Sequence, residues 1–382
     1  MTAGVRRKRI SPSRPPRSDF VLILAAGALV TMGIVELASI TSAKVSLDGI
    51  PTSMIFRNHL VRVVAGCIAF YAGTRISPSL WATWSKPLLI VSLTLLFLPG
   101  LNRLGIHPPF VCNETNGAYR SLCLGTFSFM PGELFKLPLI LWIARFLTSG
   151  RLKSEGYMAT ITPLIVLSAA VTALLLQPSF STSIGLSIVA ICILFLAGVK
   201  RLPVAFIVFI CVLAGGFIFG QSGYRNVRLR EHSFSLSVDP RELPYHPRQS
   251  IIGLGCGGMW GAGLGQGRQP YGFLPEIHSD YPLSAIGEEM GFAGTSIVIL
   301  FFCLILFRGF AIARNSMDSF SFLVACGLTL NITVFGLINV GVATAVLPPT
   351  GQVLPFVSYG GASTMTNLLS VGILDSIHRS NQ

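Results

Sequence analysis

Asp19-Phe20-Val21-Leu22-Ile23-Leu24-Ala25-Ala26-Gly27-Ala28-Leu29-Val30 opens an apolar run that extends to residue 43. A run of about twenty apolar residues with few charges is typical of a helix that crosses a membrane. Similar runs recur along the chain, and the one at 319–345 is long enough to include a break. Together they predict an all-α integral membrane protein with ten transmembrane helices. These helices are expected at residues 19–43, 59–76, 85–100, 133–149, 158–177, 181–199, 203–221, 283–307, 319–345 and 360–377.

The composition agrees with a membrane protein and excludes a soluble globular one. Of the 382 residues, 52% are hydrophobic and only 11% are charged. The net charge of +13 is a feature shared with basic proteins that bind nucleic acids. Here most of the excess lies at the predicted cytoplasmic ends of helices, where membrane topology and anionic lipids explain it. We therefore expect no nucleic-acid partner.

The positions of basic residues predict the topology. Six of them crowd the N-terminus and favour a cytoplasmic location for that end: Arg6, Arg7, Lys8, Arg9, Arg14 and Arg17. Alternation from there leaves few basic residues in the short outer loops, and it places the C-terminus in the cytoplasm as well. The first apolar run is too long for a signal peptide and no convincing cleavage site follows it, so we expect it to be retained.

The chain is expected to form one polytopic membrane domain over residues 19–377. Residues 1–18 are rich in Arg, Ser and Pro, and they predict a disordered basic cytoplasmic segment. A long extracytoplasmic loop is expected at 221–282, between the seventh and eighth helices, and residues 378–382 form a short cytoplasmic tail. We find no internal repeat, which disfavours a transporter built from two similar halves.

The strongest candidate for a catalytic or cation-binding residue lies at the end of the long loop. Asp280 follows His278 closely and stands just before a predicted transmembrane helix. A carboxylate at the mouth of a membrane cavity is suited to accept a proton or to hold a divalent cation. Aspartate is also a good N-cap, so a structural role at the start of the helix is the alternative. Glu288 and Glu289 follow inside that helix, where an ionisable group normally has a role or a partner.

Two further sets of charged residues are candidates. Glu133 and Lys136 are three positions apart at the start of a predicted helix, so they share a face. They either form an anchoring ion pair or serve a site. Arginines in the outer loops suit a pyrophosphate, because the planar guanidinium binds two oxygens at once. The arginines concerned are Arg120, Arg225, Arg228 and Arg268, and simple solvation is the alternative for each.

Two segments do not suit a regular helix. The near-alternate glycines at residues 253–267 predict either a flexible re-entrant segment or a platform where the backbone approaches a ligand. Three prolines predict a shaped outer turn before the last helix. They lie in the run Leu347-Pro348-Pro349-Thr350-Gly351-Gln352-Val353-Leu354-Pro355-Phe356-Val357-Ser358-Tyr359-Gly360-Gly361-Ala362-Ser363. Such a turn suits a binding site, and it equally suits a structural elbow.

Two of the eight cysteines differ from the rest. Cys112 and Cys123 both fall in the predicted outer loop 101–130, on the oxidising side of the membrane in the predicted topology. A disulfide between them is one expectation, and two unpaired thiols are the other. No Cys-x-x-Cys pair or Cys/His cluster in the sequence suggests a structural metal.

Taken together, these segments resemble the SEDS family (shape, elongation, division and sporulation), which contains the FtsW/RodA-type peptidoglycan polymerases. The run from Leu347 to Ser363 is similar to that family's C-terminal signature. Met130–Lys136 is similar to the family's Pro-Ser-Glu-x-x-Lys segment, with Gly132 in place of serine. Three further segments are similar in the same order as in the family: Trp260–Gly267, Leu274–Asp280 and Ile286–Gly291.

The resemblance implies an activity and a site. The implied reaction is glycosyl transfer from the lipid-linked disaccharide precursor, lipid II, at the outer face of the bacterial cytoplasmic (inner) membrane during division or elongation. Asp280 matches the family's essential loop aspartate, which implies a catalytic base or a ligand for a divalent cation (Mg or Mn). The residues expected to bind substrate are Glu133, Lys136, Arg120, Arg225, Arg268, His278, Glu288, Ser358 and Tyr359.

The resemblance also implies partners, and it leaves two alternatives open. The implied partners are a class B penicillin-binding protein, which cross-links the glycan, and other proteins of the division or elongation complex. A lipid II flippase is the first alternative, because Glu133, Lys136, Glu288 and Glu289 are expected at depth in the membrane. An inactive division scaffold is the second alternative.

The sequence departs from the family pattern in two places. Gln177-Pro178-Ser179 stands where family members commonly have Gln-Pro-Asp, so any cation-binding role of that carboxylate is in doubt here. Ser121 and Leu122 stand where a tryptophan is usual near Arg120. The Gly-Thr-Phe-Ser-Phe run at 125–129 favours an FtsW-like over a RodA-like member.

Overall fold

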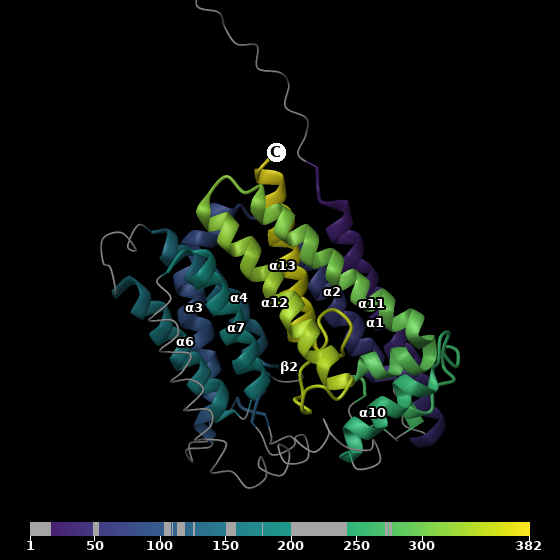
Figure 1. The fold of residues 1–382 in the computed structure, drawn as a ribbon. Helices are drawn as coiled ribbons and strands as arrows, with labels where there is room; N and C mark the ends of the chain where they lie inside the picture. Colours follow the sequence, from purple (N-terminus) through teal and green to yellow (C-terminus); the bar gives the residue numbers. More distant parts are fainter. Residues whose placement is uncertain are drawn as a thin grey trace, which may run out of the picture.

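The protein folds as a bundle of long helices (Figure 1). The structure is a computed structural model, and it describes residues 17–48, 53–102, 108, 110–112, 119–124, 127–149, 158–177, 179–199, 243–271, 274 and 277–382. The long helices are α1 (Phe20–Asp48), α2 (Ser53–Arg75), α3 (Pro78–Leu101), α4 (Pro131–Thr148), α6 (Met158–Leu176), α7 (Phe180–Leu196), α11 (Pro282–Arg314), α12 (Ser319–Ala343) and α13 (Gly361–Ser380). Shorter elements are the strands β1 (Leu122–Leu124) and β2 (Phe127–Phe129), the helix α10 (Tyr245–Cys256) and a 3-10 turn, η3 (Gln269–Tyr271).

The predicted apolar runs and the observed helices agree closely. Each predicted run coincides with one of the long helices, except that the run at 203–221 lies outside the described residues. In the described part of the chain, five helices are long and apolar enough to cross a membrane, namely α1, α2, α3, α11 and α12. The prediction of an all-α multi-pass membrane protein is therefore confirmed. The break allowed for in the 319–345 run does not occur, because α12 is continuous from Ser319 to Ala343.

Prolines mark where several of these helices begin. Pro78, Pro131 and Pro282 each occupy the first turn of a helix, where the missing N–H removes no hydrogen bond and the fixed φ angle favours the helical conformation. The side chain of Asp318 begins α12 in a different way, by accepting a hydrogen bond from the N–H of Ser321 (2.9 Å).

The predicted helix at 283–307 is not regular. The backbone of α11 kinks at Gly291, which has a φ of 68° and a ψ of −164°. This left-handed φ is open to glycine because glycine has no β-carbon. A β-carbon at Gly291 would lie 2.4 Å from the amide nitrogen of Gly261, so the kink is also where another segment packs against the helix.

That other segment is the glycine run at 253–267. Its backbone donates to the kinked start of α11, from Ala262 N–H to Glu288 O (2.9 Å) and from Gly263 N–H to Glu289 O (3.0 Å). A β-carbon at Gly257 would lie 1.8 Å from the carbonyl oxygen of Gly287. The glycines therefore allow close contact between two backbones of this protein. The structure packs residues 257–263 against the kinked start of α11.

Replacing Gly257 with alanine is expected to destabilise the protein by about 3 kcal/mol, because the new methyl group overlaps the backbone of α11. Gly257 has a φ of −70°, which alanine adopts readily, so the cost comes from overlap alone. The matched control is Gly255→Ala, since a β-carbon at Gly255 has no atom within 4 Å among the described residues. Thermal unfolding in detergent checks this, and equal melting temperatures for both variants would contradict the packing.

The residues that lead into α1 and the C-terminal residues meet at one end of the bundle. The N–H of Asp19 donates to Asp375 Oδ1 (2.9 Å), and the Asp19 carboxylate accepts from Arg308 Nε (3.1 Å). The N–H of Arg17 donates to Gln382 Oε1 (2.6 Å). In Figure 1 the start of α1 (purple) and the C-terminus lie together, whereas α10 and β2 lie at the opposite end.

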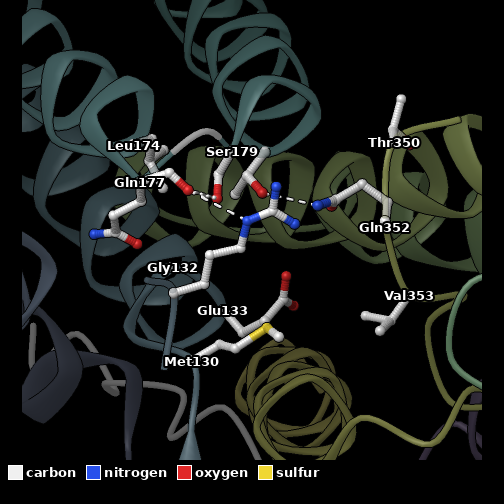
Figure 2. A pocket seen from close by; sticks show the side chains of 12 residues that line it. Met130, Gly132, Glu133, Leu174, Gln177, Ser179, Thr350, Gln352 and Val353 are labelled. Atoms are coloured by element: carbon white, nitrogen blue, oxygen red, sulfur yellow. Dashed lines mark hydrogen bonds between the residues drawn. The ribbon is translucent and has the colours of Figure 1, made fainter. Parts of the chain in front are cut away.

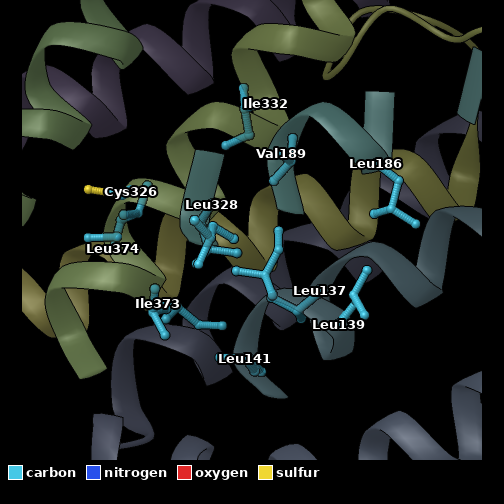
Figure 3. Packing of buried hydrophobic residues seen from close by; sticks show 14 of the residues in the cluster. Leu137, Leu139, Leu141, Leu186, Val189, Cys326, Leu328, Ile332, Ile373 and Leu374 are labelled. Atoms are coloured by element: carbon cyan, nitrogen blue, oxygen red, sulfur yellow. The ribbon is translucent and has the colours of Figure 1, made fainter. Parts of the chain in front are cut away.

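Apolar side chains fill the space between the central helices. Figure 3 shows leucine and isoleucine side chains of α4, α7, α12 and α13 packed together. Leu141, Leu186 and Leu328 are fully buried there. Large apolar side chains on the outer surface of the bundle, such as Phe307 on α11, are exposed instead, as expected where a helix faces lipid.

Candidate functional site

The candidate site lies at the end of the bundle opposite the start of α1 and the C-terminus (Figures 1 and 2). It is a small pocket that opens to solvent, with a cavity volume of about 30 Å³ for water-sized molecules. Three segments contribute most of its wall: the start of α4, the turn between α6 and α7, and the turn after α12. The lining residues are Arg120, Met130, Gly132, Glu133, Leu174, Gln177, Ser179, Thr182, Thr350, Gly351, Gln352 and Val353.

Glu133 reaches the pocket because α4 begins directly beside the pocket. Strand β2 ends at Phe129, and Pro131 starts the helix, so Glu133 falls in the first turn. Its Oε1 atom lies 2.6 Å from Lys136 Nζ, with only 9% of the Glu133 side chain and 4% of the Lys136 side chain exposed. The Lys136 ammonium also lies 3.4 Å from the centre of the Phe335 ring. The two charges form a buried ion pair, and Glu133 lines the pocket as well.

Arg120 and Asp280 approach each other across Gly351. A β-carbon built on Gly351 would lie 3.3 Å from Arg120 Nη1 and 3.5 Å from Asp280 Oδ2. Gly351 has a left-handed φ of 67°, which a residue with a β-carbon rarely adopts. Glycine at this position therefore provides both the turn and the space in which a guanidinium and a carboxylate share one edge of the pocket.

Asp280 directly precedes the N-cap of α11. That N-cap is Tyr281, whose side chain makes no capping hydrogen bond. Arg120 is held from its other side, where its Nε donates to the carbonyl oxygen of Gln177 (3.2 Å). A carboxylate and a guanidinium so placed are able to exchange a proton with a ligand and to bind an anionic group.

Asn339 fixes the backbone on which Asp280 stands. Its buried side-chain amide donates to the carbonyl oxygens of Asp280 (2.9 Å) and Gln352 (2.6 Å). One amide on α12 thus joins the turn before α11 to the turn that contains Gly351. Because both turns are irregular, this bridge determines how far Asp280 lies from the rest of the pocket.

Replacing Asn339 with leucine is expected to lower the free energy of unfolding by about 2–5 kcal/mol, because two carbonyl groups lose their donor in a buried place. The control is Asn331→Leu on the same helix, because Asn331 is also buried and its Oδ1 has no hydrogen-bond partner among the described residues. Thermal unfolding of both variants is the measurement. If the two lose equal stability, the bridge does not hold the turns together.

Three predicted site residues lie beside the pocket and connect its turns. The Ser358 hydroxyl accepts a hydrogen bond from Leu354 N–H (2.7 Å) and closes the turn between them. Tyr359 N–H donates to the carbonyl oxygen of His278 (2.9 Å), and the two rings lie 5.6 Å apart. The Arg62 guanidinium covers the Tyr359 ring at 4.7 Å. The contacts of Ser358, Tyr359 and His278 therefore support the shape of the two turns.

Other predicted site residues are placed elsewhere. The Glu288 carboxylate accepts from the backbone N–H groups of Arg268 (2.9 Å) and Gln269 (3.0 Å), so it holds the end of the glycine run. The Arg268 side chain is exposed. The structure does not bring these residues to the pocket, and Arg225 lies outside the described residues.

Several pocket residues were not predicted. Gln352 Nε2 donates to the Thr182 hydroxyl (2.8 Å) and joins the turn after α12 to α7. Gln352 lies inside the proline-rich run, so the sequence indicated its neighbourhood as a possible binding site. Nothing in the sequence around Thr182 indicates a site residue there. Ser179, the residue in place of the usual aspartate, lines the pocket and donates to the same Gln177 carbonyl that accepts from Arg120 (3.3 Å). Figure 2 shows Gln177 and Ser179 on one wall and Gln352 facing them.

The oxygens on either side of Gly351 are the candidate ligands for a cation beside Asp280. Among the described residues, no group of three or more His, Cys, Asp and Glu side chains is arranged to hold a metal. The nearby donors are oxygens, since Thr350 Oγ1 and Gln352 Oε1 are buried without a hydrogen-bond partner in the described part of the chain. Mg²⁺ commonly uses one or two carboxylates, retains water and takes its other ligands from substrate phosphates. Asp280, Thr350 and Gln352 would hold such an ion together with a phosphorylated ligand.

A disulfide lies in the segment before the pocket. Cys112 and Cys123 are bonded in the structure, with their α-carbons 5.2 Å apart. Cys123 belongs to β1, which pairs antiparallel with β2. In the described residues, β1 and β2 are the only strands of an otherwise all-α fold.

Comparison with known proteins identifies the family. The family model of the cell cycle proteins FtsW, RodA and SpoVE matches residues 19–382. The chain belongs to this family. The SEDS resemblance and the FtsW-like prediction agree with this match and with the relatives. The "Probable peptidoglycan glycosyltransferase FtsW" of Trichlorobacter lovleyi is 32% identical over 370 residues, which cover 96% of this chain and 94% of that protein. The "Stage V sporulation protein E" of Bacillus subtilis is 29% identical and covers 94% of this chain and 97% of that protein.

Solved structures share the fold. A chain from a structure described as showing structural coordination of polymerization and crosslinking by a peptidoglycan synthase complex superposes with a TM-score of 0.74. It is 24% identical, and the match covers 95% of this chain and 98% of that chain. The rod shape determining protein RodA of Thermus thermophilus gives a TM-score of 0.68 at 24% identity, covering 95% and 97%. The arrangement of helices in this protein is therefore that of the FtsW/RodA fold.

Proposed function

We propose that this protein is a peptidoglycan glycosyltransferase that polymerises lipid II. One observation carries the proposal: Asp280 Oδ2 and Arg120 Nη1 meet at Gly351, on the edge of a pocket that also contains Glu133. A pocket that offers a carboxylate and a guanidinium together suits a reaction in which a hydroxyl loses a proton while a phosphorylated group departs. The names of the FtsW relatives describe the same activity.

The proposed reaction is a single inverting displacement. The acceptor sugar hydroxyl attacks the anomeric carbon of the donor, the bond from that carbon to the lipid pyrophosphate breaks, and the α-linkage becomes a β-linkage. Asp280 accepts the hydroxyl proton as the new bond forms. Arg120 faces the departing pyrophosphate and stabilises its growing negative charge. A divalent cation held beside Asp280, if bound, supplies further positive charge to the same leaving group.

Glu133 and Lys136 support the site from within the membrane. Their ion pair is buried and lies against Phe335, so its position is fixed. We propose that Glu133 contacts the sugar or pyrophosphate from the pocket floor and that Lys136 keeps its carboxylate in place. His278, Ser358, Tyr359, Glu288, Arg268 and Arg225 are retained as proposed substrate-binding residues, acting on the turns around the pocket or on the outer loop.

The proposed topology places this pocket outside the cytoplasm. The proposal has ten transmembrane helices with both termini in the cytoplasm. The hydrogen bond between Arg17 and Gln382, at the end of the bundle opposite the pocket, supports it. The domain boundaries at residues 18 and 377, and the long outer loop at 221–282, belong to the same proposal. An outward-facing pocket receives lipid II after it has crossed the bacterial cytoplasmic membrane.

A class B penicillin-binding protein is the proposed partner. The product of the proposed reaction is an uncross-linked glycan strand, which requires a transpeptidase to join it to the wall. The complex with a similar chain is described as coordinating polymerization with crosslinking, and the similarity of fold favours a comparable complex here. Other proteins of a division or elongation complex are proposed on the same family grounds.

A lipid II flippase is the second candidate function. Buried charged groups favour it, since transport requires polar groups along a path through the membrane. Glu36 on α1 is only 3% exposed, and neither of its carboxylate oxygens has a hydrogen-bond partner among the described residues. An inactive scaffold has less support, because Asp280, Arg120 and Glu133 are all present, and the departures from the family pattern that line the pocket are the uncharged residues Gly132 and Ser179.

Polymer formation tests the proposal and separates it from transport. The purified protein, in complex with its transpeptidase partner, is incubated with lipid II, and the products are separated by gel electrophoresis. We expect a ladder of glycan strands. Unchanged lipid II, in an assay where an unrelated glycosyltransferase produces strands, would contradict the proposal. Transfer of lipid II between leaflets of a vesicle without strand formation would identify a flippase instead.

A further inference from the structure

We propose that the Cys112–Cys123 disulfide is a positioning device for Arg120, and that it thereby sets the rate of the proposed glycosyl transfer. This inference rests on the proposed function, because it assigns Arg120 to the departing pyrophosphate. The two cysteines enclose Arg120 in the sequence, with a separation of 11 residues between them. Arg120 stands three residues before Cys123.

Residues 110–112, β1 and β2 form a narrow β-ribbon, and the disulfide joins the first of these segments to β1. Cys112 N–H donates to Ser121 O (3.0 Å), and Cys123 N–H donates to Phe110 O (2.8 Å). Val111 forms an isolated antiparallel bridge with Leu122. Ser121 is the residue directly after Arg120, so the backbone of Arg120 is connected to Cys112 through one hydrogen bond and to Cys123 through the chain.

The other side of the ribbon leads to the pocket. Leu122, which is 2% exposed, pairs with Phe129, and β2 continues directly into α4. The ribbon is therefore anchored on the side where Glu133 enters the pocket. On the outer side, two backbone hydrogen bonds and one bridge join residues 110–112 to residues 121–123, and the disulfide adds a covalent bond between these segments. An isolated strand pair of this length is marginally stable without such a constraint.

Arg120 reaches the pocket at the end of a long side chain, so the position of its guanidinium depends on where the backbone holds that side chain. Its Nε donates to the Gln177 carbonyl, and its guanidinium reaches the edge of Gly351 from one long side chain. Displacing a catalytic group by about 1 Å lowers the reaction rate by up to about 10²-fold. When the disulfide is reduced, the backbone at Arg120 is less constrained. The guanidinium then spends less time facing the leaving group. The expected result is a fall in kcat of about tenfold with a smaller change in KM.

A double-mutant cycle tests the coupling to Arg120. Four full-length proteins are purified with the transpeptidase partner: wild type, Cys112→Ser/Cys123→Ser, Arg120→Lys, and the combination of all three changes. Arg120→Lys keeps the charge but loses the planar fork, so it leaves a measurable rate. We expect the serine pair to lower kcat about tenfold in the wild-type background and to have little effect in the Arg120→Lys background.

Reductant provides a second measurement that does not depend on whether the serine variants fold. Dithiothreitol donates two electrons and two protons to the disulfide, giving two thiols and its own cyclic disulfide. We expect wild type to lose activity in dithiothreitol and to regain it on reoxidation. A Cys67→Ser/Cys256→Ser control, which removes two exposed free thiols, should respond in the same way as wild type.

The outcomes separate this inference from the proposed function. Absence of glycan strands with wild type contradicts the proposed function itself. Strands formed at equal rates by wild type, reduced wild type and the serine pair overturn the positioning role and leave the function intact. An equal loss from the serine pair in both backgrounds, or an Arg120→Lys variant as fast as wild type, also overturns it, because the disulfide would then act on stability and not through Arg120.

Discussion

Asp280→Asn is expected to lower the rate of glycan strand formation by about 10²–10⁴-fold, the usual contribution of a general base. Asparagine has nearly the same shape as aspartate but does not accept the acceptor hydroxyl proton, and it is a poorer ligand for a divalent cation. The backbone of Asp280 is held by Asn339 through its carbonyl oxygen, which the substitution leaves in place. The variant should therefore fold normally. The measurement is the initial rate of strand formation from lipid II.

The control for this loss is Asp318→Asn. Asp318 is an exposed aspartate that caps α12, and its carboxylate accepts from Ser321 N–H (2.9 Å). Asparagine is about as good an N-cap as aspartate, so stability and activity should stay close to those of wild type. A folded Asp280→Asn variant that makes strands as fast as this control would remove Asp280 from the chemistry and leave the pocket without its base.

Lys136→Met is expected to destabilise the protein by about 3–5 kcal/mol, because it leaves the Glu133 carboxylate buried without its partner. The measurement is the midpoint of thermal unfolding in detergent. The double variant Glu133→Gln/Lys136→Met removes both charges and should recover most of the stability, since a buried pair is often replaced at little cost.

The same double variant also tests whether Glu133 serves the substrate. Glu133 lines the pocket, whereas Lys136 is not among the described residues that do so. We expect a stable double variant that forms strands slowly. If stability and strand formation both return to wild-type levels, Glu133 has a structural role only. If the double variant is as unstable as Lys136→Met, the packing around Phe335 determines stability and the ion pair does not.

The helices of this protein were predictable because a membrane makes hydropathy decisive. A span in lipid must satisfy its own backbone hydrogen bonds, so length and apolar composition alone identify a helix. The run at 319–345 is an example, since α12 is continuous from Ser319 to Ala343 although the length of the run allowed for a break. The kink of α11 was not predictable, because it depends on Gly291 meeting Gly261 from a distant segment.

The site was predictable only in part, for a similar reason. The structure places Arg120 and Glu133 on the wall of one pocket, and it places Asp280 beside Gly351, which lines the same pocket, although these residues lie far apart in the sequence. Glu288 was expected beside them from its position in a motif, but a carboxylate that accepts two backbone N–H groups has a structural partner that sequence does not reveal. Asn339 and Thr182 were missed as site residues because their roles consist of hydrogen bonds to distant turns.

The central claim is that lipid II reacts in the pocket between Arg120, Glu133 and Asp280, and photo-crosslinking tests it most directly. A lipid II analogue with a diazirine on its disaccharide is bound to the protein–transpeptidase complex and irradiated, and the adducts are mapped by mass spectrometry. We expect adducts in residues 119–124, 130–133 and 350–353, which an excess of unmodified lipid II suppresses. Suppressible adducts confined to the end of the bundle where Arg17 meets Gln382, with none in these segments, would contradict the account.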